Sequence, residues 1–383
     1  MAATAAATSA TNVQSLPVRV ATQNLGLGVS LFPLFRADGE RERRVLVGDM
    51  YESVRDSDVP QRMAALAEDF VEVGADVIAV QEAAVIAAEG DEIDFLAELS
   101  AALDARDSGY RVAVSSVSTD ALLPAEIDGQ ETTVRLRDRD ALLVAEDVSV
   151  EDTSKSTFEN AVPVLFSESE SFQLARGFAH ASVTVPGAPV FDVVSTHLER
   201  ASEAIRTAQA EELVSWARDR PAHLVVAGDV NDEPGNGAYT TFSAALEPAT
   251  ESVSPTCCRA SDLSGGDLSR AIDHVFSRGF APLSAQRFSL DSADRVETDR
   301  GHLWPSDHAG VVTELEATEM VAKTTTVQPS NMTAEPTTGP PESSPTAENT
   351  TTTSDSSSTE TPGFGIVTTV VALAAAARIQ RSD

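Results

Sequence analysis

The sequence predicts an α/β fold in which two mixed β-sheets pack face to face with helices on the outside, a four-layer α-β-β-α sandwich. Two observations support this fold class. Short apolar runs rich in β-branched residues, typical of buried strands, alternate with amphipathic stretches at helical spacing. Several predicted strands also follow one another without a helix between them, as antiparallel neighbours do. The 383 residues can hold one large core or two domains.

The first predicted elements bring polar residues to one sheet edge. An alternating pattern predicts a strand at 18–22, which runs into Asn24. Apolar residues at helical spacing predict a helix at 61–73, and a buried strand at 76–80 follows it. Glu82 comes directly after that strand, so we expect its carboxylate near Asn24.

The remaining elements follow the same two patterns. A charged run at 134–140 indicates a solvated hairpin edge. Amphipathic stretches predict helices at 93–103 and 203–218, and apolar or alternating runs predict strands at 110–115, 141–145, 178–185, 189–197, 271–276 and 311–315.

The chain is organised around a buried strand that begins at Leu224 and breaks at Gly228. Asp229 and Asn231 follow, and residues two apart at a strand end point the same way. A carboxylate and a carboxamide can together bind a cation, a water or an anionic oxygen. The alternative is an ordinary turn, in which Gly, Asn and Asp are common.

The charge balance indicates a protein adapted to strong salt. The formal net charge is -33, and only Lys155 and Lys323 among the 27 basic residues are lysine. An acidic surface poor in lysine stays soluble where salt screens charge repulsion. The alternative is an ordinary acidic protein. In molar salt, phosphate charge contributes little to nucleic-acid binding, so the acidity does not exclude a nucleic-acid substrate.

The two cysteines, Cys257 and Cys258, are adjacent, which excludes a disulfide framework and zinc-finger spacing. Because neighbouring cysteines can form only a strained ring, we expect a pair of free thiols.

Four segments are predicted along the chain. Residues 1–17 are expected to be a disordered tail, in which no secretion signal is evident, or the true start lies upstream. Residues 18–317 are expected to form one folded domain. Residues 318–362 are rich in Thr, Ser and Pro, with two glycosylation sequons at Asn331 and Asn349, and are expected to be a disordered, glycosylated stalk.

Residues 363–383 form a C-terminal apolar segment with a basic end. Its apolar part is shorter than the roughly 20 residues that span a bilayer. The segment resembles the Pro-Gly-Phe sorting signal of haloarchaeal surface proteins, which implies cleavage by a sortase-type enzyme and attachment to a lipid. A single weak membrane anchor is the alternative. Either one implies a protein anchored to the cell surface through its C-terminus.

Polar residues stand at the ends of separate predicted strands. They are Asn24, Glu82, His197, Asp229, Asn231, Asp273, Asp307 and His308. Carboxylate and amide oxygens suit Mg²⁺ or Mn²⁺. Histidines with carboxylate partners suit proton transfer and the binding of an anionic oxygen. Together these are the parts of metal-assisted phosphoester hydrolysis.

The chain resembles the endonuclease/exonuclease/phosphatase superfamily, the deoxyribonuclease-I-like fold. The resemblance covers about residues 18–317. Bacterial secreted members are more similar still, with an Arg-Asp strand near Arg139-Asp140, a Thr-Cys segment and a Trp-Pro-Ser-Asp-His ending. The resemblance to the superfamily rests on six motifs that occur in the same order as in the family. They are Asn24, Gln81-Glu82, Thr196-His197-Leu198, Gly228-Asp229-Val230-Asn231, Ile272-Asp273 and Ser306-Asp307-His308.

The resemblance implies a role for each site residue. Asn24, Glu82 and Asp307 would hold Mg²⁺ or Mn²⁺. Asp229 would activate or position the attacking water, Asn231 would hold water or phosphate, and Asp273 would orient His308. His308 would bind the phosphoryl oxygen or move protons, and His197 would stabilise or protonate the leaving group. The other histidines match no catalytic position, and Arg176 either contacts phosphate or is ion-paired.

The sequence therefore predicts a monomeric, metal-dependent phosphodiesterase at the cell surface. Extracellular nucleic acid is the favoured candidate for its substrate. One alternative is a phosphodiesterase of the phospholipase or sphingomyelinase type, or a phosphatase, with residues 31–35 as an apolar membrane contact. The other is a surface protein without catalysis.

Overall fold

The computed structural model describes residues 16–165, 171–291 and 294–318. Nearly all of the predicted N-terminal tail, the stalk and the C-terminal segment lie outside these ranges. Among the helices of the described residues, none is both long and apolar enough to cross a membrane.

The first sheet has eight strands in the order β15-β18-β1-β2-β6-β3-β4, with β5 paired to β6. It is mixed, because β1 pairs parallel to β2 and antiparallel to β18. Its strands are β1 (Val18–Asn24), β2 (Val77–Gln81), β3 (Val85–Ala88), β4 (Asp91–Asp94), β5 (Arg111–Ile127), β6 (Gln130–Val144), β15 (Phe280–Phe288) and β18 (Gly310–Ala317).

The second sheet has six strands in the order β13-β14-β12-β11-β10-β7. The strands are β7 (Ser149–Thr157), β10 (Gly177–Thr184), β11 (Phe191–His197), β12 (Leu224–Asp229), β13 (Glu247–Pro248) and β14 (Asp273–Arg278). Two small ribbons pair β8 (Val162–Leu165) with β9 (Ser171–Leu174), and β16 (Val296–Thr298) with β17 (Gly301–Leu303).

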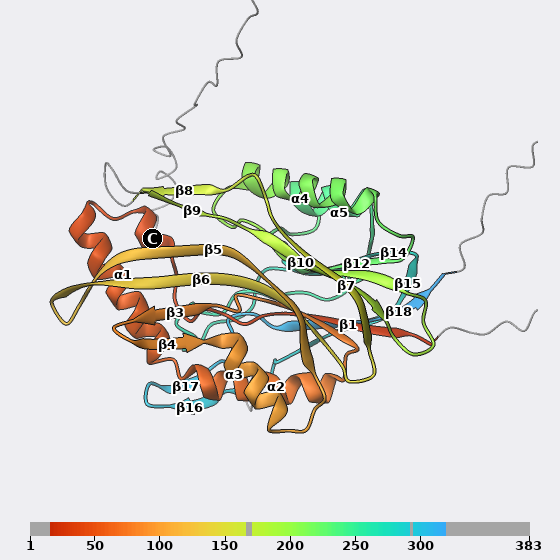
Figure 1. The fold of residues 1–383 in the computed structure, drawn as a ribbon, viewed down its shortest axis with the longest axis horizontal. Coiled ribbons are helices and arrows are strands. Elements are labelled where there is room, and N and C mark those ends of the chain that lie inside the picture. The colour runs from red at the N-terminus through yellow and green to blue at the C-terminus, as the bar shows by residue number, and fades with distance from the viewer. Residues whose placement is uncertain (1–15, 166–170, 292–293, 319–383) are drawn as a thin grey trace, which may run out of the picture. The chain divides into compact units, whose positions relative to one another are not determined.

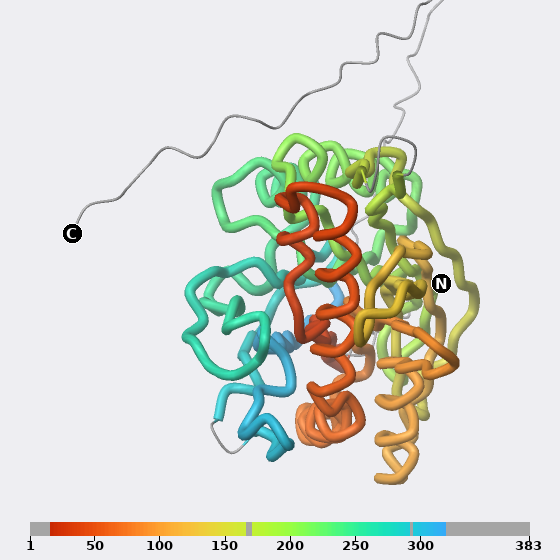
Figure 2. The backbone as a smooth tube through the Cα atoms, turned by 90° about the vertical axis from the view of Figure 1, so that its left-hand side faces the viewer, coloured from red at the N-terminus to blue at the C-terminus, as the bar shows by residue number. Residues whose placement is uncertain are grey.

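Three apolar cores define four layers, as the fold class predicts. Residues of both sheets, such as Leu142 and Val225, form the central core. The outer face of the first sheet packs on α1 (Glu40–Arg55), α2 (Val59–Val73) and α3 (Phe95–Asp104). The outer face of the second sheet packs on α4 (Glu203–Arg218) and α5 (Gly237–Ser243). Figure 1 shows α4 and α5 on the side of the sheets opposite α2 and α3, and Figure 2 shows this order from the side.

The structure differs from the predicted elements in several places. Helix α3 begins at Phe95 rather than residue 93, because residues 91–94 form β4 and the Asp94 side chain accepts a hydrogen bond from the Ala97 amide at 2.9 Å. The charged run at 134–140 is the middle of one long strand, β6, paired with β5. Helix α1 was not predicted, although Val47, Met50, Tyr51 and Val54 have helical spacing and are buried.

The expectation of free thiols is wrong, because the structure joins Cys257 and Cys258 in a disulfide. Backbone hydrogen bonds on both sides of Cys257 hold this segment against Arg270.

Close packing of β11 against β12 fixes the residues at their carboxyl ends. The two strands are parallel, and Thr196 lies opposite Gly228. A Cβ atom on Gly228 would lie 1.9 Å from the Thr196 carbonyl oxygen. Only glycine allows this approach, which holds His197 level with Asp229.

We therefore expect Gly228→Ala to destabilise the full-length protein by about 1–3 kcal/mol, because the added methyl group forces the two strands apart. Urea unfolding in concentrated KCl measures this. Gly265→Ala is the matched control, since its Cβ would meet nothing within 4 Å. Equal unfolding midpoints for the two variants would contradict the close-packing argument.

Candidate active site

Three polar residues form one row across the second sheet. Asp229, the last residue of β12, lies opposite His197 in β11 and opposite Asp273 in β14. All three are at most 2% exposed. The row lies at the end of the central apolar strand, β12, so the charged side chains of the row lie at the edge of the core.

The first sheet brings Asn24 and Glu82 to the same place. Asn24, the last residue of β1, has its Nδ2 atom 3.3 Å from Glu82 Oε1 and 3.1 Å from Asp229 Oδ2. Glu82 lies where β6 changes partner from β2 to β3, and its φ of 52° is left-handed. This conformation is uncommon for a residue with a side chain and is found more often at functional sites. The Asn24 amide thus links the two sheets at the row.

The loop at 304–309 brings the last two candidate residues. Ser306 Oγ donates to the Asn24 carbonyl at 2.7 Å and accepts from the His308 amide at 3.0 Å. A Cβ atom on Gly26 would lie 2.9 Å from Asp307 Oδ1, and Gly26 N donates to Asn24 Oδ1 at 2.9 Å. Asp307 therefore lies close to the turn that follows Asn24.

His308 and Asp273 form a buried ion pair. The Nδ1 atom of His308 lies 2.9 and 3.0 Å from the two carboxylate oxygens of Asp273. Burial alone would lower the pKa of His308, but the charge and hydrogen bond of Asp273 outweigh it and raise that pKa to about 10. His308 is thus an imidazolium at neutral pH, and its Nε2 lies 3.8 Å from Asp229 Oδ2.

Asp229 is poised to exchange a proton near neutral pH. Burial, and next the negative charge of Asp273, raise its pKa to about 7. One carboxylate oxygen accepts from the Asn231 amide at 2.8 Å, which leaves the other toward Asn24 and the two histidines. Asn231 itself is left-handed, with a φ of 57°.

His197 differs from His308 because an arginine, not a carboxylate, lies against its ring. Arg176 Nη1 is 3.1 Å from His197 Nδ1 and donates to Asp138 Oδ2 at 2.7 Å. Burial and the positive charge of Arg176 lower the pKa of His197 well below its usual value. The site therefore contains one neutral and one charged imidazole. Arg176 is ion-paired, one of the two alternatives left open by the sequence.

A sequence model of the endonuclease/exonuclease/phosphatase family matches residues 21–308, which include every candidate residue above. The chain belongs to the endonuclease/exonuclease/phosphatase family. Members of this family are generally phosphoesterase hydrolases. Residues 361–381 match the PGF-CTERM motif, which indicates a surface protein anchored through its C-terminus.

Several solved structures are similar to this chain, and the one with a TM-score above 0.5 supports the shared fold. A family member from Bacteroides thetaiotaomicron is 19% identical with a TM-score of 0.52, over 80% of this chain and 97% of its own. A mannosyl-6-phosphatase from the same organism is 18% identical with a TM-score of 0.49, over 78% and 99% of the two chains. Truncated TDP2 from Caenorhabditis elegans is 19% identical with a TM-score of 0.47, over 79% and 98%. No curated protein matches the chain.

The residues of this chain that the resemblance implies as metal ligands have donor atoms that suit a hard divalent cation. Asn24, Glu82 and Asp307 offer amide and carboxylate oxygens, which Mg²⁺ and Mn²⁺ prefer. Asp229, Asp273 and His308 also have ligand atoms within 4.8 Å of one another. Within that group, Asp273 and His308 are already paired with each other.

Two buried carboxylates on β6 were not among the predicted site residues. Asp138 is the partner of Arg176, and burial raises its pKa to about 6. Asp140 is 1% exposed, and neither of its oxygens has a hydrogen-bond partner among the described residues. Burial and the charge of Asp138 raise the pKa of Asp140 well above its usual value, which favours the neutral acid. The available sequence signal was the alternation of Arg and Asp at 137–140, which indicated a charged edge and, at Arg139-Asp140, a resemblance to bacterial secreted members.

The other histidines lie outside the cluster. His180 contacts Ser154, Asp192 and Arg220, and His274 lies against the carbonyl oxygens of Asp232 and Ala271. The rings of His223 and Phe280 are in contact, and His302 is exposed.

Proposed function

We propose that this protein is a metal-dependent phosphodiesterase that works outside the cell. Nucleic acid is the substrate that we favour. The observation that carries the proposal is the contact of Asn24 with both Glu82 and Asp229, beside the charged His308–Asp273 pair. Oxygen donors, a carboxylate that titrates near neutral pH and a fixed imidazolium are the groups that hydrolysis of a phosphodiester needs.

In the proposed reaction, Asn24, Glu82 and Asp307 would hold the cation, which would neutralise part of the phosphoryl charge. Asp229 takes the proton of the attacking water at the oxygen not bound by the Asn231 amide. His308, kept charged by Asp273, donates from Nε2 to a phosphoryl oxygen. Asn231 also holds water or phosphate. His197 stabilises or protonates the leaving oxygen as its bond to phosphorus breaks, and the proton taken by Asp229 then passes to solvent.

The substrate is tested with the full-length chain in concentrated KCl with Mg²⁺ or Mn²⁺. The panel contains DNA, RNA, bis-p-nitrophenyl phosphate, a phosphomonoester and sphingomyelin or phospholipid vesicles. The proposal expects cleavage of DNA or RNA and of the model diester. Cleavage of none of these compounds would support a surface protein without catalysis.

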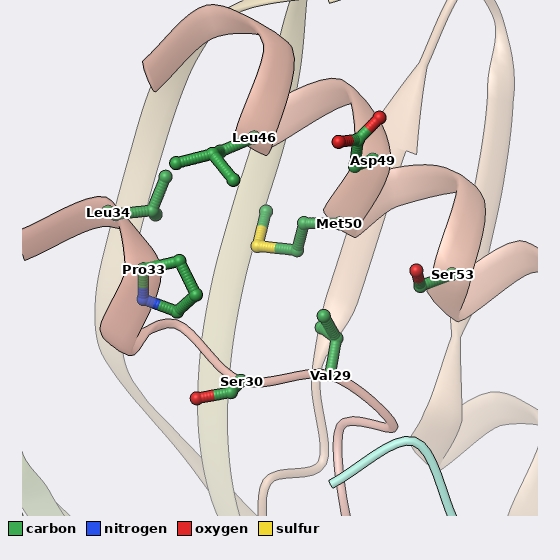
Figure 3. Close-up of a pocket in the computed structure, with 8 residues that line it drawn as sticks. All are labelled: Val29, Ser30, Pro33, Leu34, Leu46, Asp49, Met50 and Ser53. Carbon is green, nitrogen blue, oxygen red and sulfur yellow. The ribbon is translucent and has the colours of Figure 1, made fainter. Parts of the chain in front are cut away.

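A phospholipase-type phosphodiesterase is the second candidate, and one observation favours it. The 3₁₀ helix η1 (Phe32–Phe35) and α1 form an apolar groove of about 90 Å³, in which Leu34, Leu46 and Met50 meet (Figure 3). Arg200, three residues after His197, lies 5.0 Å from the centre of the Phe32 ring. Preferential cleavage of the lipid substrates would favour this candidate.

The roles of the site residues predict large losses of activity on substitution. We expect Glu82→Gln, Asp229→Asn and His308→Ala each to lower kcat about 10²- to 10⁴-fold while the protein remains folded, because each removes a reacting or metal-binding group. Steady-state kinetics and circular dichroism measure the two effects. Matched controls at exposed sites are Glu131→Gln, Asp56→Asn and His302→Ala. Near-full turnover in the three site variants would show that the cluster is not catalytic.

The oxygen donor set predicts dependence on a divalent cation. EDTA is expected to abolish activity, and Mg²⁺ or Mn²⁺ to restore it. Because a ligand that binds only the native state stabilises it, Mn²⁺ should also raise the Tm of the wild type but not of Glu82→Gln. Full activity in excess chelator would overturn the metal dependence.

We further propose that a sortase-type enzyme cleaves the chain near Pro362-Gly363-Phe364 and attaches a lipid. The short apolar run and the basic end formed by Arg378 and Arg381 support this, as does the PGF-CTERM match. Mass spectrometry of the mature surface protein is expected to find no peptide from residues 366–383. Recovery of such peptides from the mature form would rule out cleavage, and recovery of the protein only from cytosol would rule out anchoring.

A further inference from the structure

The loop that carries Asp307 and His308 is held by a buried guanidinium group. Arg259 is 5% exposed, and its Nη1 donates to the carbonyl oxygens of Ser306 and His308, both at 3.0 Å. Its Nη2 donates to the Ser289 carbonyl at 2.7 Å. One side chain thus binds the backbone on both sides of Asp307.

Two further contacts tie Arg259 to the same loop. Its amide donates to the Asp307 carbonyl at 2.9 Å, so every residue at 306–308 gives a carbonyl to Arg259. Its guanidinium carbon lies 3.8 Å from the centre of the Trp304 ring, a cation–π distance. Lysine cannot reproduce this contact set, because it lacks the planar fork of donors.

The same segment also holds the other half of the ion pair. Thr256 Oγ1 accepts hydrogen bonds from the amides of Ile272 and Asp273 at 3.1 and 3.2 Å. The Thr256 carbonyl accepts from the Ala309 amide at 2.8 Å. Residues 256–259 are therefore bonded at one end to the start of β14 and at both ends to the loop of His308.

We propose that Thr256 and Arg259 are positioning residues, which set the distance between Asp273 and His308 by bracing β14 and the 304–309 loop against each other. The Thr-Cys segment, which begins at Thr256, and the Trp-Pro-Ser-Asp-His motif at 304–308 then act together to position the ion pair. The contribution to catalysis rests on the proposed function, whereas the contacts do not.

There is a physical reason why the ion pair needs the support of Thr256 and Arg259. His308 and Asp273 come from elements separated by 35 residues, and neither element alone fixes their separation. The loop has no strand pairing of its own at 304–309. Arg62 from α2 supports it on another side, with Nε donating to the Pro305 carbonyl at 3.0 Å and Nη2 to the Leu25 carbonyl at 2.9 Å. Hydrogen bonds from buried, charged donors are strong enough to fix such a loop.

The test compares Arg259→Ala with Arg278→Ala in the full-length protein, using bis-p-nitrophenyl phosphate as the substrate. Arg278 is a matched control, because its Nη2 also binds three carbonyls, those of Ala217, Arg220 and Pro221, at the opposite end of β14. We expect Arg259→Ala to lower kcat about 10²-fold with little change in KM, since misplacement of a catalytic group by about 1 Å has this effect. Added guanidinium ion at millimolar concentration should restore part of kcat, and ammonium should not.

Further variants keep the outcome decisive. If Arg259→Ala does not fold, Arg259→Lys and Thr256→Val are measured in its place, and both should lower kcat more than Arg278→Ala does. Equal kcat in all these variants, or a loss that guanidinium does not relieve in folded Arg259→Ala, overturns the positioning role. An inactive wild type would instead overturn the proposed function.

Discussion

The alignment of His197, Asp229 and Asp273 in one row across β11, β12 and β14 is the constraint on which the rest of the structure depends. Each of these strands has an apolar body that packs between the sheets or under α4 and α5. Strand pairing fixes the register, and the register sets the polar ends side by side. A slip of one residue would turn every side chain of a strand to the other face, so the core and the site cannot vary independently.

The row also concentrates negative charge where little water reaches. Glu82, Asp138, Asp140, Asp229 and Asp273 lie in or beside it, and burial raises the pKa of three of them. Arg176 and His308 supply compensating positive charge, and Asn24 donates between Glu82 and Asp229. An uncompensated buried carboxylate is costly, so this arrangement favours a bound divalent cation.

The sequence predicted the parts of the fold that depend on local pattern. Residues 203–218 form a helix as predicted. The last residues of β1, β11 and β12 are Asn24, His197 and Asp229, which the sequence analysis placed at the ends of predicted strands. The catalytic and metal-binding roles of these residues stay predictions. Arg62 and Arg259 could not be found this way, because a buried arginine that binds backbone carbonyls has the same sequence signal as a solvated one. The disulfide was missed because two adjacent cysteines have the same sequence signal whether they are free or bonded, and a strained ring was judged the less favourable of the two.

We propose that Asn24 and Glu82 at the edge of the first sheet, with Asp307 in the 304–309 loop, form one cation site beside Asp229 of the second sheet. The most direct measurement is anomalous diffraction at the manganese edge from crystals of the full-length protein grown with Mn²⁺. The account predicts one strong peak within bonding distance of a Glu82 carboxylate oxygen, and loss of that peak in Glu82→Gln. A peak bound instead by Asp273 and His308, or no peak at saturating Mn²⁺, would contradict it.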